Sequence, residues 1–421
     1  MSLKNKYSAY LITIGDEILI GQVVDTNSTW IADKLSEIGI NVEKIISIQD
    51  KESEILEALT EAKNKVGYVF ITGGLGPTID DITKRTIGKF LESEMEFNPD
   101  FFAKVKSYVE KRGAKLDDMM YNYSFFPKNI TYLNNSVGTA PGMKFNSEET
   151  VYFSMPGVPN EMKAIFSEEI EPKLKIENKD FFIFKKTILT AGEMEASIAD
   201  KLKPIVDNIP QNLSIAYLPN LGKVRIRITG KGTDKNKIKS DVADFSNKIE
   251  TELGNIVFGY NNDIFEEIIG KSLVKHKLKL ATAESCTGGM IAHKITSIPG
   301  SSEYFNGSII SYSNDIKTNL LHVKKETLNE YGAVSEQTVK QMVKGAIEQL
   351  YCDIAIGVSG IAGPGGGTPQ KPVGTIWIAV GNSETISTEK LQLGNNRLKN
   401  IETSTILALN KLRLFIQQHY N

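Results

Sequence analysis

The stretch AESCTGG, residues 283–289, lies at a predicted junction between a β-strand and an α-helix. The apolar run at 278–282 predicts the strand, and residues 290–295 have the spacing of a helix. Ser285 is therefore expected at the carboxyl end of a strand, beside the free N–H groups and positive dipole end of a new helix. Such a place suits an anion or a developing oxyanion, and the paired glycines permit close approach.

A second glycine-rich stretch, SGIAGPGGG at 359–367, follows the predicted strand 353–358. Two glycine-rich strand exits in one segment predict a pocket at the carboxyl edge of a sheet. Each exit taken alone is equally compatible with an ordinary α/β turn.

Strands and helices alternate at both ends of the chain, which predicts α/β domains with mainly parallel sheets. In the first segment, strands at 10–14, 41–48 and 68–71 alternate with helices at 27–37 and 52–64, and a strand at 151–155 precedes a helix to about 172. The last segment has expected strands at 278–282, 307–313, 353–359, 374–380 and 388–393, and a closing helix at 396–418. We predict two α/β domains, residues 1–172 and 257–421, joined by a small α+β module at 173–256.

The middle segment reads as a hairpin of strands 212–219 and 223–229, flanked by helices at 194–206 and 234–253. In its second strand, apolar residues alternate with Arg225 and Arg227, as in a sheet with one wet face. We interpret the arginines as a solvated face and not as an RNA site, because no G-x-x-G clamp is present.

Composition predicts a soluble globular protein. The 421 residues include 49 Lys and Arg against 51 Asp and Glu. The sequence contains no long basic run, so we expect no nucleic-acid partner. Cys286 and Cys352 form neither a metal motif nor a disulfide framework. No signal peptide or membrane span is apparent, so we expect a cytoplasmic protein with no membrane partner.

Ser285 is a candidate nucleophile, which requires a base. None of the four histidines lies in a recognisable triad context, and no G-x-S-x-G elbow surrounds the serine. The alternative base is a lysine or tyrosine, and Tyr312 and Lys317 follow the strand at 307–313. A desolvated lysine loses its proton more readily. The competing interpretation is a surface lysine and a half-buried tyrosine.

Two neighbouring residues also have two interpretations each. Cys286 is a rival nucleophile at the helix N-terminus, or a small packed residue. Arg397 opens the last helix, where it either binds a phosphate or is an exposed first-turn residue.

The turn TGGLGPTIDD, residues 72–81, follows the predicted strand 68–71. Its backbone N–H groups suit a phosphate, while Asp80 and Asp81 suit a divalent metal held against it. The aspartates are otherwise caps of the next helix. The turn matches neither a P-loop nor a dinucleotide fingerprint.

The C-terminal motifs AESCTGG, YSNDIK at 312–317, GAVSEQTV at 332–339 and SGIAGPGGG followed by KPVGTIWIA resemble the C-terminal domain of the CinA family over about 160 residues. The resemblance implies a nicotinamide mononucleotide deamidase that releases ammonia and needs no cofactor. It implies catalytic roles for Ser285, Tyr312, Lys317 and Ser359. The residues expected to bind substrate or oxyanion are Thr287, Gly288, Gly289, Gly360, Ala362, Gly363 and Arg397.

The N-terminal motifs GDEIL at 15–19, DTN at 25–27, TGGLGPTIDD, GTAPG at 138–142 and PGVPNEM at 156–162 resemble the molybdopterin-binding-like domain of CinA proteins. That resemblance implies hydrolysis of ADP-ribose with a divalent metal of the Mg, Mn or Co class, and Asp50 and Asp81 as catalytic residues. The expected substrate-binding residues are Thr72, Gly73, Gly74 and Gly76, and the expected metal ligands are Asp16, Asp80 and Asp81. The middle segment is similar to the family's KH-like module, and the resemblance implies a homodimer.

Two other functions compete with a two-activity hydrolase of pyridine nucleotide salvage. One is a protein that binds or adenylylates molybdopterin and leaves ADP-ribose intact. The other is a non-enzymatic scaffold in DNA uptake, in which Ser285→Ala changes nothing. The family's name refers to competence and DNA damage, but the net charge of -2 gives no physical support for DNA binding.

Overall fold

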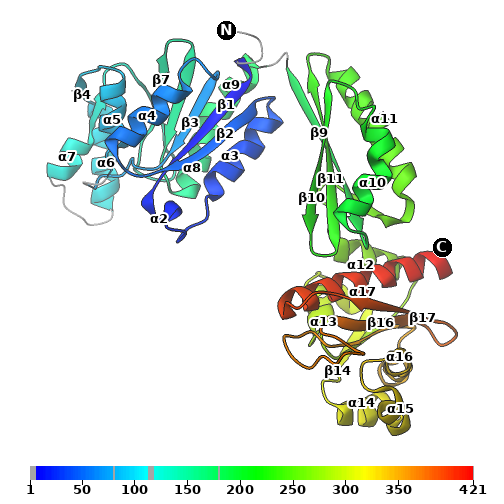
Figure 1. Ribbon diagram of the computed structural model, residues 1–421. Coiled ribbons are helices and arrows are strands. Elements are labelled where there is room, and N and C mark those ends of the chain that lie inside the picture. The colour runs from blue at the N-terminus through cyan, green and yellow to red at the C-terminus, as the bar shows by residue number, and fades with distance from the viewer. Residues whose placement is uncertain (1–5, 79–80, 112–117, 179–180, 421) are drawn as a thin grey trace. The chain divides into compact units, whose positions relative to one another are not determined.

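The computed structural model describes residues 6–78, 81–111, 118–178 and 181–420 (Figure 1). It contains two compact units, residues 1–184 with 230–239 and residues 185–229 with 240–421. Both units contain sheets packed against helices, so the predicted α/β class is confirmed.

The first unit contains a six-stranded sheet in the order β2-β1-β3-β8-β7-β6. Its strands are β1 (Ser8–Ile14), β2 (Asn41–Ile48), β3 (Tyr68–Thr72), β6 (Thr131–Leu133), β7 (Gly142–Ser147) and β8 (Thr150–Met155). β2, β1, β3 and β8 are parallel, β7 pairs antiparallel with β8, and β6 pairs antiparallel with β7. The carboxyl ends of the four parallel strands therefore lie at one edge.

Helices cover both faces of this sheet. Leu11 and Phe70 pack with α3 (Thr26–Glu37) and α8 (Pro159–Ile165) on one face. Ile12 and Ile71 pack with α4 (Glu52–Ala62), α5 (Thr83–Phe90) and α6 (Pro99–Lys111) on the other. Consecutive strand residues point to opposite faces, so a strand buried on both sides is apolar throughout.

Several elements of this unit differ from the prediction. The helix expected to end near residue 172 continues through a π-helical turn (Phe166–Ile170) and α9 (Glu171–Glu177). The elements that were not predicted are α2 (Asp16–Leu19), β4 (Met95–Phe97), α6, α7 (Asp118–Tyr123), β5 (Phe125–Pro127), β6 and β7. Strands of three residues, such as β4 and β5, are too short to show a period.

The KH-like module has a four-stranded sheet in the order β10-β11-β9-β12. It comprises β9 (Phe182–Ala191), α10 (Glu195–Val206), β10 (Leu213–Asn220), β11 (Lys223–Gly232), α11 (Lys235–Leu253), a 3-10 turn (Gly254–Ile256) and β12 (Val257–Tyr260). In β11, Val224, Ile226 and Ile228 are buried while Arg225 is exposed. The predicted one-sided strand is confirmed.

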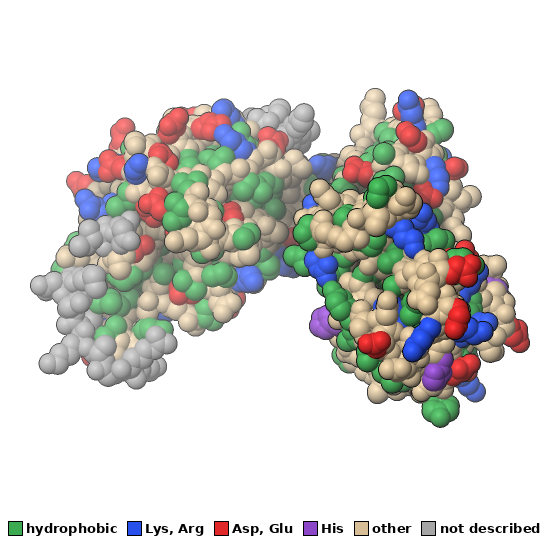
Figure 2. Space-filling model, turned by 60° about the horizontal axis from the view of Figure 1, so that its bottom comes forward, with side chains coloured by type: hydrophobic (Ala, Val, Ile, Leu, Met, Phe, Trp, Pro, Cys, Tyr) green, Lys and Arg blue, Asp and Glu red, His purple; other side chains and the backbone are tan. Residues whose placement is uncertain are grey.

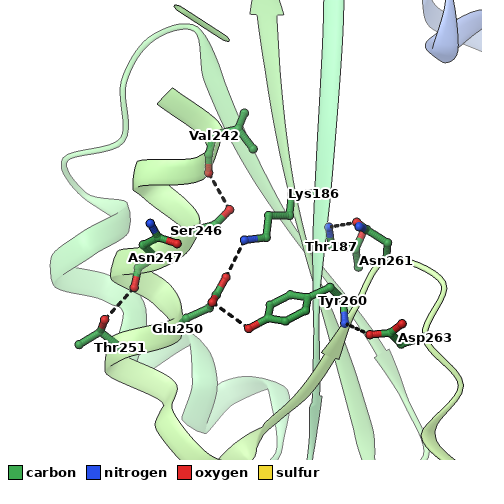
Figure 3. A network of polar contacts seen from close by, with 10 residues as sticks. All are labelled: Lys186, Thr187, Val242, Ser246, Asn247, Glu250, Thr251, Tyr260, Asn261 and Asp263. Atoms are coloured by element: carbon green, nitrogen blue, oxygen red, sulfur yellow. Dashed lines mark hydrogen bonds and ion pairs between the residues drawn. The ribbon is translucent and has the colours of Figure 1, made fainter. Parts of the chain in front are cut away.

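A polar network joins α11 to two strands of this module (Figure 3). The Glu250 carboxylate on α11 accepts from Lys186 Nζ on β9 at 2.8 Å and from the Tyr260 hydroxyl on β12 at 2.8 Å. Next to it, the amide oxygen of Asn261 accepts from the Thr187 N–H at 3.0 Å. One carboxylate thus fixes the helix against both strands.

The C-terminal sheet of the second unit has the order β14-β13-β15-β16-β17. Its strands are β13 (Leu280–Glu284), β14 (Phe305–Ile310), β15 (Ile354–Gly360), β16 (Thr375–Gly381) and β17 (Ile386–Gln392). β14, β13 and β15 are parallel, β16 pairs antiparallel with β15, and β17 pairs antiparallel with β16. β13 extends two residues beyond the predicted end, which places Ser285 immediately after the strand.

This sheet is also covered on both faces. Ile356 packs with α12 (Phe265–Lys275), α13 (Met290–Thr296) and α17 (Arg397–His419). Ala355 packs on the other side with α16 (Glu336–Leu350), near α14 (Asn314–Leu321) and α15 (Lys325–Tyr331). A short 3-10 turn (Ser301–Glu303) precedes β14.

Charged side chains are distributed over the surface of each unit. On the face seen in Figure 2, Lys and Arg are interspersed with Asp and Glu. Within the described ranges, none of the helices combines the length and apolar character that a membrane span requires.

Candidate functional site

A cavity of about 210 Å³ opens where the parallel strands of the C-terminal sheet end. Ser285 follows β13, Tyr312 follows β14, and Ser359 lies near the end of β15, so three strand ends contribute. The lining residues are Ser285, Cys286, Tyr312, Asn314, Lys317, Ala333, Val334, Ser359, Gly360, Ala362 and Arg397. The two predicted glycine-rich exits thus form one cavity, and none of the four histidines lines it.

Ser285 and Lys317 form the chemical centre of this cavity. Lys317 Nζ lies 3.0 Å from Ser285 Oγ and donates to the Ser311 carbonyl at 2.6 Å. The lysine is only 1% exposed, and burial lowers its pKa to about 8. The interpretation of Lys317 as a surface lysine is therefore wrong. At this distance a neutral lysine amine has the geometry to accept a hydroxyl proton.

Arg397 and Tyr312 lie together at the rim of the cavity. Arg397 Nη2 donates to the Tyr312 hydroxyl at 2.9 Å, and Nη1 donates to the Gly363 carbonyl at 2.8 Å. Tyr312 is 63% exposed, so the interpretation of a half-buried tyrosine is wrong. The guanidinium carries its positive charge to the cavity mouth, where an anionic group would meet it.

The helix N-terminus beside Ser285 is already occupied by a carboxylate. Glu284 Oε2 accepts from the N–H groups of Gly289 and Ile291 at 3.0 and 3.1 Å, and Oε1 accepts from Ala292 at 2.8 Å. The Gly288 N–H donates to the Ser285 carbonyl. The expectation that Gly288 and Gly289 supply oxyanion donors is therefore wrong.

Two backbone donors remain beside the candidate nucleophile. In the described part of the chain, the N–H groups of Cys286 and Thr287 have no acceptor on another residue, and the Cys286 N–H interacts with its own sulfur. The N–H of the residue after a nucleophilic serine is a common oxyanion donor in hydrolases. Of the predicted donors, Thr287 remains a candidate, and Cys286, which was not predicted as a donor, joins it.

The remaining predicted residues of this site have different environments. Ser359 is buried, and its hydroxyl donates to the Ala333 carbonyl at 2.7 Å, so it braces the wall of the cavity. Burial raises the pKa of the Cys286 thiol to about 12, which disfavours a thiolate and supports the packed interpretation. Gly360 and Ala362 line the cavity, and their contact with a substrate stays a prediction.

The glycine turn of the first unit lies at the carboxyl edge of its sheet. Gly73 follows β3 with a φ of +109°, and its N–H donates to the Met155 carbonyl at 3.1 Å. A Cβ atom on Gly73 would collide with the Ile14 carbonyl oxygen. Only glycine lets the ends of β1, β3 and β8 approach so closely.

Asp50 and Asp81 both contact this turn. Asp81 Oδ2 accepts from the Thr78 N–H at 3.0 Å, and a Cβ atom on Gly76 would collide with it. Asp50 Oδ1 lies 2.9 Å from the position of a Cβ atom on Gly74. Two carboxylates that are distant in the sequence therefore each lie against this turn, one at Gly74 and one at Gly76.

The other interpretation of the aspartate pair, as helix caps, applies only partly to the described residues. Ile82 is the N-cap of α5, no side chain caps this helix, and Asp81 bonds to Thr78 instead. Asp80 lies outside the described residues. Asp16 is exposed in the first turn of α2.

The described residues at this edge of the sheet supply only some of the ligands that a divalent metal needs. Across the described ranges, no three His, Cys, Asp or Glu side chains gather as a metal cage. Mg²⁺ often takes only one or two carboxylates and completes its shell with water and substrate phosphate. Asp50 and Asp81 suit that arrangement, and the buried hydroxyls of Thr72 and Thr83, which have no hydrogen-bond partner in the described chain, offer further polar atoms.

Each of the three segments matches the model of a known protein family. Residues 10–176 match the family model "Probable molybdopterin binding domain", residues 185–259 match "Damage-inducible protein CinA KH domain", and residues 262–416 match "CinA C-terminal domain". A CinA-like protein of Cytophaga hutchinsonii is 41% identical over 96% of this chain and 97% of its own length. This chain belongs to the CinA family.

Further similar proteins cover all or part of this chain. A CinA-like protein of Flavobacterium psychrophilum is 39% identical over 98% of this chain and 99% of its own length. The crystal structure of the competence/damage inducible protein CihA from Agrobacterium tumefaciens is 34% identical, covering 37% of this chain and 98% of that chain, with a TM-score of 0.35.

Sequence reasoning missed several residues of the CinA C-terminal site, among them the lining residues Ala333 and Val334. Asn314 lines the cavity from the first turn of α14. Glu284, which precedes the nucleophile candidate, is completely buried at the end of β13. A glutamate ending an otherwise apolar strand was the available signal for a buried carboxylate, but its partners on α13 come from the tertiary fold.

Proposed function

We propose that the C-terminal site hydrolyses the carboxamide of nicotinamide mononucleotide to the carboxylate and releases ammonia. The observation that carries this proposal is the 3.0 Å approach of Lys317 Nζ to Ser285 Oγ inside a cavity. A serine beside a buried lysine is a nucleophile with its base, the arrangement that acyl transfer requires.

In the proposed mechanism, neutral Lys317 accepts the Ser285 proton as Oγ attacks the carboxamide carbon. The oxyanion that forms meets the N–H groups of Cys286 and Thr287. Lys317 then gives its proton to the leaving nitrogen, ammonia departs, and an acyl-serine remains. Water, deprotonated by the same lysine, hydrolyses the ester to release nicotinate mononucleotide and restore Ser285.

The phosphate of the substrate favours the rim that Arg397 occupies. Its guanidinium is bonded to the Gly363 carbonyl and the Tyr312 hydroxyl, which hold it at the mouth. A guanidinium presents paired donors that match phosphate oxygens. Tyr312 thereby orients the phosphate-binding arginine in addition to lining the cavity.

We propose a second activity in the N-terminal domain, the metal-dependent hydrolysis of ADP-ribose. The contacts of Asp50 and Asp81 with one glycine turn support it, because backbone N–H groups favour phosphate and carboxylates favour a metal bridged to it. A bound divalent metal would neutralise the pyrophosphate charge. The same edge also suits a pterin phosphate, so binding of molybdopterin with ADP-ribose left intact is the second candidate function.

The deciding experiment incubates the purified protein with nicotinamide mononucleotide and, separately, with ADP-ribose, with and without divalent metal, and identifies the products. Ser285→Ala should reduce deamidation by up to about 10⁶-fold, the scale seen when a catalytic serine is removed. Cys286→Ala is the matched control and should keep most of the activity, since its thiol is buried and protonated. Full deamidation by the Ser285→Ala protein would refute the covalent mechanism.

A further inference from the structure

Glu284 has an unusual environment for a charged side chain. It is completely buried, and its carboxylate accepts three backbone N–H groups from the first turns of α13. Thr282 Oγ1 adds a longer contact of 3.3 Å. In the described chain no Lys or Arg pairs with this carboxylate. The backbone donors and the helix dipole therefore compensate the buried charge.

The backbone of Glu284 is also hydrogen-bonded to the segment that carries Lys317. The Ser311 N–H donates to the Glu284 carbonyl at 2.7 Å, and the Ser311 carbonyl accepts Lys317 Nζ at 2.6 Å. On the other side, the Ser285 N–H donates to the Val358 carbonyl of β15 at 2.9 Å. Hydrogen bonds of Ser311 thus connect Glu284, which precedes Ser285, to Lys317.

The short segment from Ser285 to Gly288 is held at both ends by this arrangement. β13 fixes its start, and the Glu284 carboxylate fixes its end by holding Gly289 and the start of α13. Gly288 and Gly289 have φ values of +61° and +96°, so the chain reverses sharply between the two ends. The position of Ser285 Oγ depends on that reversal.

We propose that Glu284 is a positioning residue, whose carboxylate holds the turn after β13 against α13 and thereby keeps Ser285 Oγ within reach of Lys317. This inference rests on the proposed function for the role of Ser285 as nucleophile. Misplacement of a reacting group by about 1 Å costs on the order of 10²-fold in rate. Loss of the carboxylate should therefore lower turnover and spare substrate binding, because Arg397 is held by other contacts.

The first test is Glu284→Gln, which keeps the volume but turns one acceptor into an N–H₂ group facing backbone N–H donors. We expect kcat to fall about 10- to 100-fold, with KM changed less than about twofold and the pH profile of kcat unshifted. Ile295→Val is the matched control, because this buried residue of α13 packs in the core and has no polar side-chain contact. Its kcat should stay within about twofold. Equal losses in both variants, or unchanged kcat in Glu284→Gln, would overturn the inference.

The second test does not depend on the substrate. A fluorophosphonate probe should label Ser285 in the parent protein and label the Glu284→Gln protein at least about tenfold more slowly, as measured by mass spectrometry. If Glu284→Gln does not fold, Glu284→Asp is judged by the same two readouts, since the shorter side chain cannot hold all three N–H groups without moving the turn.

The outcomes separate the two proposals. A parent protein that is labelled but releases no ammonia disproves the substrate, and the labelling rates alone then decide the role of Glu284. Equal labelling of the parent and the variant overturns the positioning role. A parent protein that is not labelled also overturns it, because no activated serine would be present to position.

Discussion

At the scale of the residue, burial gives Lys317 its chemistry. Its amine is 1% exposed and bonded to one carbonyl and one hydroxyl, so burial disfavours its charged form and lowers its pKa to about 8. A lysine that loses its proton near neutral pH serves as a general base, which an exposed lysine does not.

The lowered pKa of Lys317 predicts the pH dependence of deamidation. In the proposed mechanism the neutral amine is the active form, so kcat/KM should rise as pH increases through about 8 and level off above it. A pH–rate profile at low substrate concentration measures this. A profile that is flat between pH 6 and 9.5 would rule out lysine as the titrating base.

Substitution of Lys317 separates its basicity from its charge. Lys317→Met should lower kcat far more than it changes substrate binding, and Lys317→Arg should not restore activity because arginine stays protonated.

Thermal unfolding of the Lys317 variants is the control for a loss of folding. The folded pKa lies below the unfolded value of 10.5, so the lysine's contribution to stability is lost as pH falls toward about 8. At neutral pH, the Lys317→Met protein should therefore be no less stable than the parent by thermal unfolding. An active Lys317→Arg protein would contradict the role of Lys317 as a base.

At the scale of the element, the regular strands could be predicted because apolar runs and flanking turns define them. β2 is predicted with its observed bounds, Asn41–Ile48, and α17 differs from the prediction by one residue at each end. The predicted end of β13 was two residues too early, because a glutamate after an apolar run is typical of the start of a turn. Its burial is possible only through N–H groups of α13, a tertiary effect that periodicity does not contain.

The candidate site was predictable to a similar degree. Serine, tyrosine, lysine and arginine were expected near the strand ends, and the structure brings all four to one cavity. Gly288 and Gly289 were assigned incorrectly as oxyanion donors, whereas Thr287 remains a candidate donor. The N–H groups at a helix N-terminus next to a serine are expected to be free, and the sequence does not show that other acceptors already bind them. Spacing indicates which groups meet, but not which hydrogen bonds are already made.

The network around Glu250 predicts how α11 is held in the KH-like module (Figure 3). The Lys186–Glu250 ion pair has side chains only 25% and 23% exposed, and Glu250 also accepts the Tyr260 hydroxyl. Tyr260→Phe should cost about 0.5–1.5 kcal/mol and Glu250→Ala more, because the latter leaves both donors without their acceptor. Hydrogen exchange of the α11 amides measures the loss. Unchanged protection in Glu250→Ala would mean that apolar packing alone holds the helix.

At the scale of the whole molecule, the two proposed sites have the same kind of location on separate cores. Each lies where parallel strands end, with helices on both faces of the sheet. Asp81 belongs to the first compact unit and Ser285 to the second. Because ligand sites in α/β sheets form at carboxyl strand ends, one fold principle accounts for both locations.

The separation of the cores predicts that the two activities can be removed independently. Asp81→Ala deletes a carboxylate that contacts the glycine turn at Gly76 and should eliminate metal-dependent cleavage of ADP-ribose. Chelation should have the same effect, because charge neutralisation assists pyrophosphate cleavage while a serine cleaves an amide without metal. Deamidation should remain near the parent rate in both cases, since Ser285 and Lys317 lie in the other unit. The measurement pairs AMP release with ammonia release on one preparation, with Ser285→Ala as the reciprocal control. Equal loss of both activities on chelation, or in Asp81→Ala, would show that the sites are coupled and that the two domains do not divide the chemistry between them.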